Sequence, residues 1–214
     1  MRRFLPLFLA FSLTCSVVAN AQSDAKSKAV LQEMTKKMSS LKSMKANFVL
    51  NITGTKVKDT KKGNIALKGE KYHISLSGQE IICDTKTVWT YNIDAKEVQV
   101  SAYNPSEQSM SPAKLLTNSY EKEYQSVYKG EKKEKGKTFD VVELKPIDAN
   151  SKVNKIELLI DKSTSVVSSG NIWEKNGNRI QYTISNFTPN APVTDALFSW
   201  NAKEHAGIEV VDLR

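Results

Sequence analysis

Side chains that could carry out nucleophilic, acid–base or metal chemistry are few in this sequence and widely separated. His73 and His205 are far apart, and neither has neighbours at the spacing of metal ligands. Cys83 could pair with a histidine as a nucleophile, but it follows Ile81 and Ile82, a setting typical of a buried and inert thiol. His73 alternates with apolar residues and is expected on the solvated face of its strand. These residues predict neither a metal site nor a nucleophile.

The carboxylates give no stronger indication of catalysis. Glu80 and Asp84 are close in sequence, but nothing marks them as a paired general acid and base. We therefore expect a protein that is not an enzyme, needs no cofactor and functions through its apolar residues.

Apolar residues recur with two different periods, and each period predicts one kind of element. An amphipathic helix comes first, with Ser23 or Asp24 as its cap. Its apolar face consists of Val30, Leu31, Met34, Met38 and Leu41. From Lys45 onward the period is two, which indicates half-buried β-strands. Residues that alternate in this way include Phe48, Leu50, Ile52, Tyr72, Ile74, Leu76, Ile180, Tyr182 and Ile184.

Turn-forming residues divide this region into about ten or eleven consecutive strands. Asn176-Gly177-Asn178 is the strongest hairpin mark, because Gly and Asn tolerate the positive φ of a tight turn. The alternation stops between Tyr103 and Tyr124, where residues 111–116 predict a short helix. The expected fold is mainly β with α, a single curved antiparallel sheet whose opening is closed by the N-terminal helix and the short helix.

The N-terminus predicts export. Arg2 and Arg3 precede an uncharged apolar run over residues 4–18, and Ala19-Asn20-Ala21 is a typical signal peptidase site. We expect residues 1–21 to be a signal peptide and residues 22–214 to form one domain. Cys15 allows the alternative of a lipid-anchored protein, but Ser12-Leu13-Thr14 fits that cleavage pattern poorly.

Removal of residues 1–21 would reduce the formal net charge from +8 to +6 and leave Cys83 as the only cysteine. An intramolecular disulfide would then be impossible. The basic surface could favour anionic lipids or an acidic partner, or it could serve solubility. Nucleic acid is not an expected partner, because the lysines are scattered and lack interleaved aromatic residues.

Several segments, in order along the chain, resemble the LolA family of periplasmic lipoprotein carriers. They are Ala46-Asn47-Phe48, residues 63–67, residues 84–92 with Trp89 and Tyr91, residues 111–116, residues 156–161, Gly177-Asn178, Phe198-Ser199-Trp200 and residues 207–212. The resemblance implies an incomplete (half) β-barrel with a helical lid. Two positions depart from the family. Gly69-Glu70, between Lys68 and Lys71, replaces an Arg-Pro pair whose Arg helps to hold the lid closed, and Lys lacks the planar fork of Arg. Thr85 replaces the Gly of an Asp-Gly turn, which predicts a changed turn type.

The resemblance implies a monomeric periplasmic carrier that binds the acyl chains of lipoproteins in an apolar cavity and moves them from the inner to the outer membrane. Its partners would be an inner-membrane releasing complex and an outer-membrane acceptor. The alternatives are a binder of another amphiphile, such as a lipid or glycolipid, and an envelope-stress sensor or scaffold.

One apolar face is expected to form the cavity, although the same residues could fill a dry core, because interior positions alternate with exterior ones along every strand. Trp89 and Tyr91 are expected on the concave face or beneath the helices. The candidate lining residues are Met34, Met38, Phe48, Leu50, Ile65, Leu67, Tyr72, Ile74, Trp89, Tyr91, Leu115, Ile180 and Tyr182.

Overall fold

A computed structural model describes residues 16–55, 57–104 and 120–214 of the chain, and the mainly β prediction is confirmed within them. The helical elements are α1 (Ser16–Ser39) and three short 3-10 turns, η1 (Tyr120–Lys122), η2 (Asp195–Phe198) and η3 (Ala202–Glu204). The strands are β1 (Met44–Thr53), β2 (Lys58–Lys68), β3 (Lys71–Leu76), β4 (Gln79–Cys83), β5 (Thr87–Asn92), β6 (Glu97–Ala102), β7 (Tyr124–Glu134), β8 (Lys137–Pro146), β9 (Val153–Asp161), β10 (Val166–Glu174), β11 (Arg179–Pro189) and β12 (Glu209–Asp212). The short helix expected at residues 111–116 lies outside the described residues.

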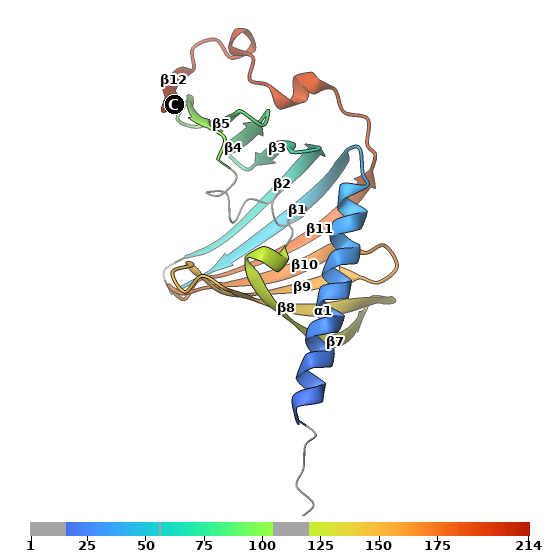
Figure 1. The fold of residues 1–214 in the computed structure, drawn as a ribbon. Helices are drawn as coiled ribbons and strands as arrows, with labels where there is room; N and C mark the ends of the chain where they lie inside the picture. Colours follow the sequence, from blue (N-terminus) through green and yellow to red (C-terminus); the bar gives the residue numbers. More distant parts are fainter. Residues whose placement is uncertain (1–15, 56, 105–119) are drawn as a thin grey trace, which may run out of the picture.

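All twelve strands belong to one open sheet, in the order β12-β6-β5-β4-β3-β2-β1-β11-β10-β9-β8-β7. Every neighbouring pair is antiparallel except β12 and β6, which run parallel. The central pair is β1 with β11, which we call the seam, because it joins the β2–β6 side of the sheet to the β7–β10 side (Figure 1). The expected single sheet is confirmed, and its edge strands β12 and β7 leave it unclosed.

Helix α1 lies across one face of the β7–β10 side (Figure 1). The predicted apolar face of the helix is confirmed, since Leu31, Met34 and Met38 are buried. Ser27 fixes the helix to β7, because its Oγ lies 2.8 Å from the Ser126 Oγ and 3.0 Å from the Ser126 carbonyl oxygen. No helix within the described part of the chain is long and apolar enough to cross a membrane.

The predicted start of this helix is wrong. Instead of beginning at Ser23 or Asp24, α1 begins at Ser16. Ser23 and Asp24 have helical residues on both sides, so neither of them caps the helix. The expected cleavage point between Ala21 and Gln22 therefore lies within the helix.

The other face of the β2–β6 side is covered by residues 190–214, which we call the C-terminal segment. The segment leaves the end of β11, crosses β3 through η2, and ends as β12 beside β6 (Figure 1, red). Phe198 of η2 is only 1% exposed. Asp195 accepts hydrogen bonds from the ammonium groups of Lys68 and Lys71 at 3.0 and 2.9 Å. The sheet is thus layered on one face by α1 and on the other by the C-terminal segment.

Several turns connect the strands through residues with positive φ, and two of them bear on the sequence predictions. Gly177 (φ 89°) lies in the β10–β11 hairpin, which confirms that predicted turn. Thr85, in the β4–β5 turn, takes φ 83°, a region that favours glycine. Asp84 holds this turn, because its Oδ1 accepts the backbone N–H groups of Lys86 and Thr87 at 2.8 Å each. The β4–β5 turn therefore has the positive φ that glycine favours, although residue 85 is Thr.

Candidate functional site

The strand register assigns each residue to the face that carries α1, which we call the helix face, or to the opposite face. One row of paired residues across the helix face is Val142, Leu158, Gly170, Tyr182 and Leu50. Side chains alternate between faces along a strand, so the residues two positions away from these also lie on the helix face. Nearly all of the large apolar residues of the sheet that were expected to share one face do so.

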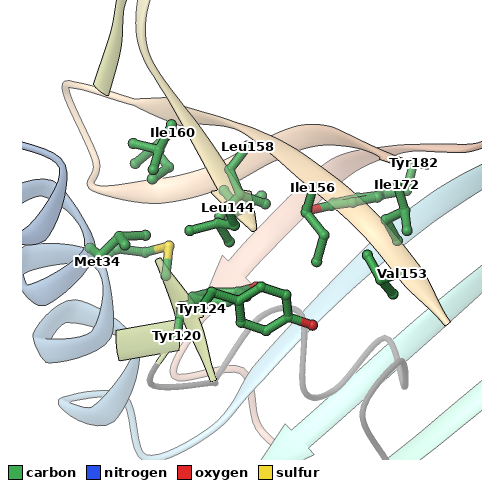
Figure 2. Close-up of a cluster of buried hydrophobic side chains, with 13 residues drawn as sticks. Met34, Tyr120, Tyr124, Leu144, Val153, Ile156, Leu158, Ile160, Ile172 and Tyr182 are labelled. Carbon is green, nitrogen blue, oxygen red and sulfur yellow. The ribbon is translucent and has the colours of Figure 1, made fainter. Parts of the chain in front are cut away.

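Two buried clusters occupy the helix face, one on each side of the seam. The first, which we call the α1 cluster, packs beneath the helix (Figure 2) and consists of Leu31, Met34, Tyr120, Tyr124, Val142, Leu144, Val153, Ile156, Leu158, Ile160, Val167, Ile172 and Tyr182. The second, which we call the β1–β5 cluster, consists of Met38, Met44, Ala46, Phe48, Ile65, Leu67, Tyr72, Ile74, Cys83, Val88 and Val166. Both clusters are packed cores in this structure.

The seam between the two clusters is less completely covered. Leu50 and Ile184 are partly buried and contact both clusters. Ile180 and its cross-strand partner Ile52 are also partly buried. We call these four residues the seam strip. From Ile184 to Ile180 the strip runs about 13 Å along β11 at about 3.3 Å per residue. It is the accessible apolar part of the β1–β11 pair on the helix face.

Tyr182 stands at the centre of this region and carries a polar atom. Its ring lies over Gly170 on β10, where an added Cβ would come within 2.6 Å of the Tyr182 Oη. The hydroxyl is buried and finds no hydrogen-bond partner among the described residues. Burial raises the pKa of the Tyr182 phenol, so the group stays protonated and remains a hydrogen-bond donor. A donor thus lies next to the seam strip in an apolar setting.

The predicted lining residues fall into three groups. Ten of them lie on the helix face or on the apolar side of α1, most of them in the two clusters. Of these ten, Leu50 and Ile180 belong to the seam strip. Leu115 lies outside the described residues, and Trp89 and Tyr91 form the third group.

The expectation that Trp89 and Tyr91 lie on the concave face or beneath the helices is wrong. The β4–β5 turn pairs Cys83 with Val88, so Val88 faces the β1–β5 cluster and Trp89 points to the opposite face. There the Tyr91 ring lies 5.1 Å from the Trp200 ring, beneath the C-terminal segment. The alternation was predicted correctly but its phase was not, because a second apolar layer on the opposite face gives aromatic residues another place to be buried.

Trp200 and His205 pack with Tyr91 on the opposite face and were not among the predicted lining residues. The rings of Trp200 and His205 stack at 3.8 Å between centroids, and the His205 and Tyr91 rings form a T-shaped pair at 5.6 Å. The Phe198-Ser199-Trp200 stretch offered the signal, since large aromatic residues in an irregular segment need a surface to cover.

His73 and Cys83 lie on opposite faces of the sheet. Cys83 is fully buried on the helix face, where burial raises the pKa of its thiol, and it behaves as the predicted buried thiol. His73 lies on the opposite face with Nε2 buried 3.6 Å from Glu80, so its predicted solvation is wrong. The C-terminal segment covers that face, so the His73 side chain is only 20% exposed at a position that alternation had marked as solvated.

Comparisons with known proteins match this architecture. The family model "Outer membrane lipoprotein carrier protein LolA" covers residues 39–201. An uncharacterized conserved protein from Thermus thermophilus has a TM-score of 0.61 at 11% identity, with 87% of this chain and 99% of that chain covered. A putative outer membrane lipoprotein-sorting protein domain from Vibrio parahaemolyticus has a TM-score of 0.50 at 14% identity, with 85% and 99% covered.

A DUF1329 family protein from Desulfovibrio piger is similar to the same extent, with a TM-score of 0.50 at 13% identity and with 84% of this chain and 98% of that chain covered. No curated protein matches the sequence. At these identities the solved structures establish the fold alone, whereas the family model spans most of the sequence. The chain therefore belongs to the LolA family of outer membrane lipoprotein carrier proteins.

Proposed function

We propose that this protein is a non-enzymatic periplasmic carrier that binds the acyl chains of lipoproteins along the seam strip. The single observation that carries the proposal is the partly buried apolar strip formed by Leu50, Ile52, Ile180 and Ile184 between two packed clusters. Membership of the LolA family supports the choice of ligand. The carrier would receive its cargo at the inner membrane and deliver it to an acceptor at the outer membrane.

The energetics of an acyl chain explain why such a surface is needed. A palmitoyl-length chain has about 14 methylenes, and each is worth roughly 0.8 kcal/mol when it is removed from water, which gives about 11 kcal/mol for the chain. Free diffusion across an aqueous compartment would therefore be negligible. A carrier has to cover most of this apolar area while keeping the site accessible for release. A strip that is partly buried, rather than sealed, supports both requirements.

The binding site can be tested with one pair of variants on a single strand. Leu50 lies on the helix face, and its neighbour Val49 is equally half-buried on the opposite face. Leu50→Gln should weaken binding of a fluorescent fatty acid and of an acylated peptide about tenfold or more, since burial of a Leu side chain is worth about 1.5–3 kcal/mol. Val49→Gln should leave both affinities unchanged. Equal losses in the two variants would contradict binding at the seam strip.

The identity of the cargo and the processing of the chain need separate measurements. Mass spectrometry of organic extracts from purified protein should find acylated peptide or phospholipid. A glycolipid would instead favour the alternative of a carrier for another amphiphile. N-terminal sequencing of the exported protein should start at Gln22, and an acylated Cys15 would show that the chain is lipid-anchored.

A further inference from the structure

Three connections lie side by side at one end of the sheet, at the left in Figure 1. They are the β1–β2 loop (residues 54, 55 and 57), the β8–β9 loop (residues 147–152) and the β10–β11 turn (residues 175–178). Asn178 packs against Gly54, which places the first loop beside the turn. Lys175 donates its backbone N–H to the Lys152 carbonyl oxygen at 2.9 Å and its ammonium to the Ala149 carbonyl oxygen at 2.5 Å. We call this end the three-loop end.

The two outer loops of this end each expose one large apolar side chain. Val57 is 47% exposed and Ile147 is 56% exposed, and they lie on either side of the β10–β11 turn. Both are held by backbone hydrogen bonds: the Val57 carbonyl oxygen accepts from Gly54 at 2.8 Å, and Ile147 donates to the Glu123 carbonyl oxygen at 2.9 Å. Single exposed apolar residues are ordinary, but two fixed at neighbouring loops form a pair that can enter an apolar phase together.

The three-loop end is also basic. Among residues 57–59, 145–152 and 174–179, five side chains are basic and three are acidic. The basic ones are Lys58, Lys145, Lys152, Lys175 and Arg179, and the acidic ones are Asp59, Asp148 and Glu174. Two of the acids are engaged locally, since Asp148 accepts from the Asn150 N–H and Glu174 from the Asn178 side chain. The combination of apolar tips with surrounding lysines fits an anionic lipid surface, which attracts each nearby cation.

The seam strip reaches this same end. Ile52 pairs with Ile180, and the next pair, Thr53 with Arg179, adjoins the loops. Helix α1 does not extend over this end, because its C-terminal half lies toward the opposite end of the sheet, where Glu33 accepts a hydrogen bond from Ser165 in the β9–β10 turn at 2.9 Å. An acyl chain that left a bilayer at the three-loop end would be close to the Ile52–Ile180 end of the seam strip.

We propose that the three-loop end docks on anionic membrane surfaces, with Val57 and Ile147 entering the interface and the lysines contacting lipid phosphates. The inference rests on the proposed carrier function and adds to it the place where cargo passes between membrane and protein. The partner of this surface is the bilayer itself rather than a protein.

Vesicle flotation tests the proposal with a matched control. Full-length protein should float with vesicles of phosphatidylglycerol and phosphatidylethanolamine, and much less with phosphatidylcholine vesicles. Val57→Ser/Ile147→Ser should weaken flotation about tenfold or more, and raised salt should weaken it further. Val210→Ser/Leu213→Ser removes side chains that are at least as exposed, at 55% and 62%, in and just after the distant edge strand β12, and it should leave flotation unchanged.

Several outcomes would overturn the proposal. They are no flotation of the unmodified protein, equal flotation with both lipid mixtures, an equal effect of the two double variants, or binding only to vesicles that contain native membrane proteins. Acyl-chain affinity without vesicles separates this inference from the proposed function. The loop variant should keep full affinity for fluorescent fatty acid, whereas Leu50→Gln should lose affinity even if vesicle docking is intact.

Discussion

The two sides of the sheet are covered in different ways. On the β7–β10 side, α1 packs on the helix face, and the opposite face is mixed, with the buried Phe139 and Leu159 beside polar residues. There Arg179 donates to Asn171 at 2.8 Å, and Asn171 donates to Glu157 at 3.1 Å. On the β2–β6 side, apolar residues are buried on both faces, with Ile74 toward the helix face and Val98 beneath the C-terminal segment. One side of the sheet is thus covered by α1 on its helix face, and the other side has an apolar layer on both faces.

This difference shows that the neighbouring layer decides which alternating residues are core residues. Where only one face is covered, as in β11 with Gln181 and Thr183 exposed on the other face, alternation between apolar and polar residues identifies the buried side correctly. Where both faces are covered, as in β4 with Ile81 and Ile82, the apolar run is nearly continuous and does not reveal the phase. The aromatic residues of β5 were assigned to the wrong face for this reason.

The largest expected effect comes from removing the anchor of the C-terminal segment. Phe198→Ala deletes a ring that is 1% exposed, and it should lower the free energy of unfolding by about 3–5 kcal/mol. Urea titration measures the loss, and hydrogen exchange should show it chiefly in β3–β5 rather than in β8 and β9. Leu213→Ala, at a residue that is 62% exposed, should change stability by less than about 0.5 kcal/mol. Uniform loss of protection would mean that the two sides are not independently covered.

A second prediction distinguishes the β1–β5 cluster from the seam strip. Ile74 is fully buried in that cluster, so Ile74→Trp should overpack it and lower stability by about 1–3 kcal/mol. Leu50→Trp should leave the melting temperature nearly unchanged and reduce affinity for fluorescent fatty acid. Thermal unfolding and a binding titration check both variants. If Leu50→Trp lowers the melting temperature as much as Ile74→Trp does, the seam is ordinary core.

The β4–β5 turn, which sends Trp89 and Tyr91 to the opposite face, provides a third prediction. Thr85 is β-branched and has φ 83°, so Thr85→Gly should relieve backbone strain and raise stability by about 1 kcal/mol. Lys86→Gly, at a neighbouring residue without positive φ, should instead lower stability by about 0.5–1 kcal/mol. Equal effects of the two substitutions in chemical denaturation would show that the turn is unstrained.

The smallest effect concerns two tyrosines on the helix face of the β7–β11 region. Tyr182→Phe removes a buried hydroxyl without a described partner, so stability should stay the same or rise by up to about 1 kcal/mol. Tyr128→Phe removes a hydroxyl that donates to Asp140 at 2.7 Å, and it should lower stability by about 1 kcal/mol. Parallel denaturation curves compare the two variants. A matching loss for Tyr182→Phe would reveal a hydrogen bond to that hydroxyl.

Much of the architecture could be predicted from the sequence because it depends on local patterns. The two-residue period identified the sheet, and the helical period identified the buried side of α1 through Leu31, Met34 and Met38. The hairpin at Gly177 followed from turn chemistry alone. These features arise between residues that are close in the chain, where short-range rules apply.

The remaining features depend on residues that are distant in sequence. Asp195 binds Lys68 and Lys71 across more than a hundred residues, so nothing near those lysines indicated that they would hold the C-terminal segment rather than a lid. The extent of each buried cluster could not be predicted from the sequence either. Ile74 and Leu50 lie in similar alternating patterns, but Ile74 is fully buried and Leu50 is partly exposed. The seam strip stays partly exposed because it lies at the border of the two buried clusters, and the local sequence pattern does not indicate where that border falls.

The pairing of β1 with β11 has a consequence for the order in which the protein folds. Met44 pairs with Pro189, and Glu97 pairs with Glu209, so the seam and the β6 edge are both completed by late parts of the chain. Contacts this distant make folding slow, because the long loop must close before they form. Until residues 179–212 arrive, β1 and β6 are open edges beside exposed apolar side chains, which is the kind of species that aggregates. Folding only after the entire chain has been released would avoid that intermediate.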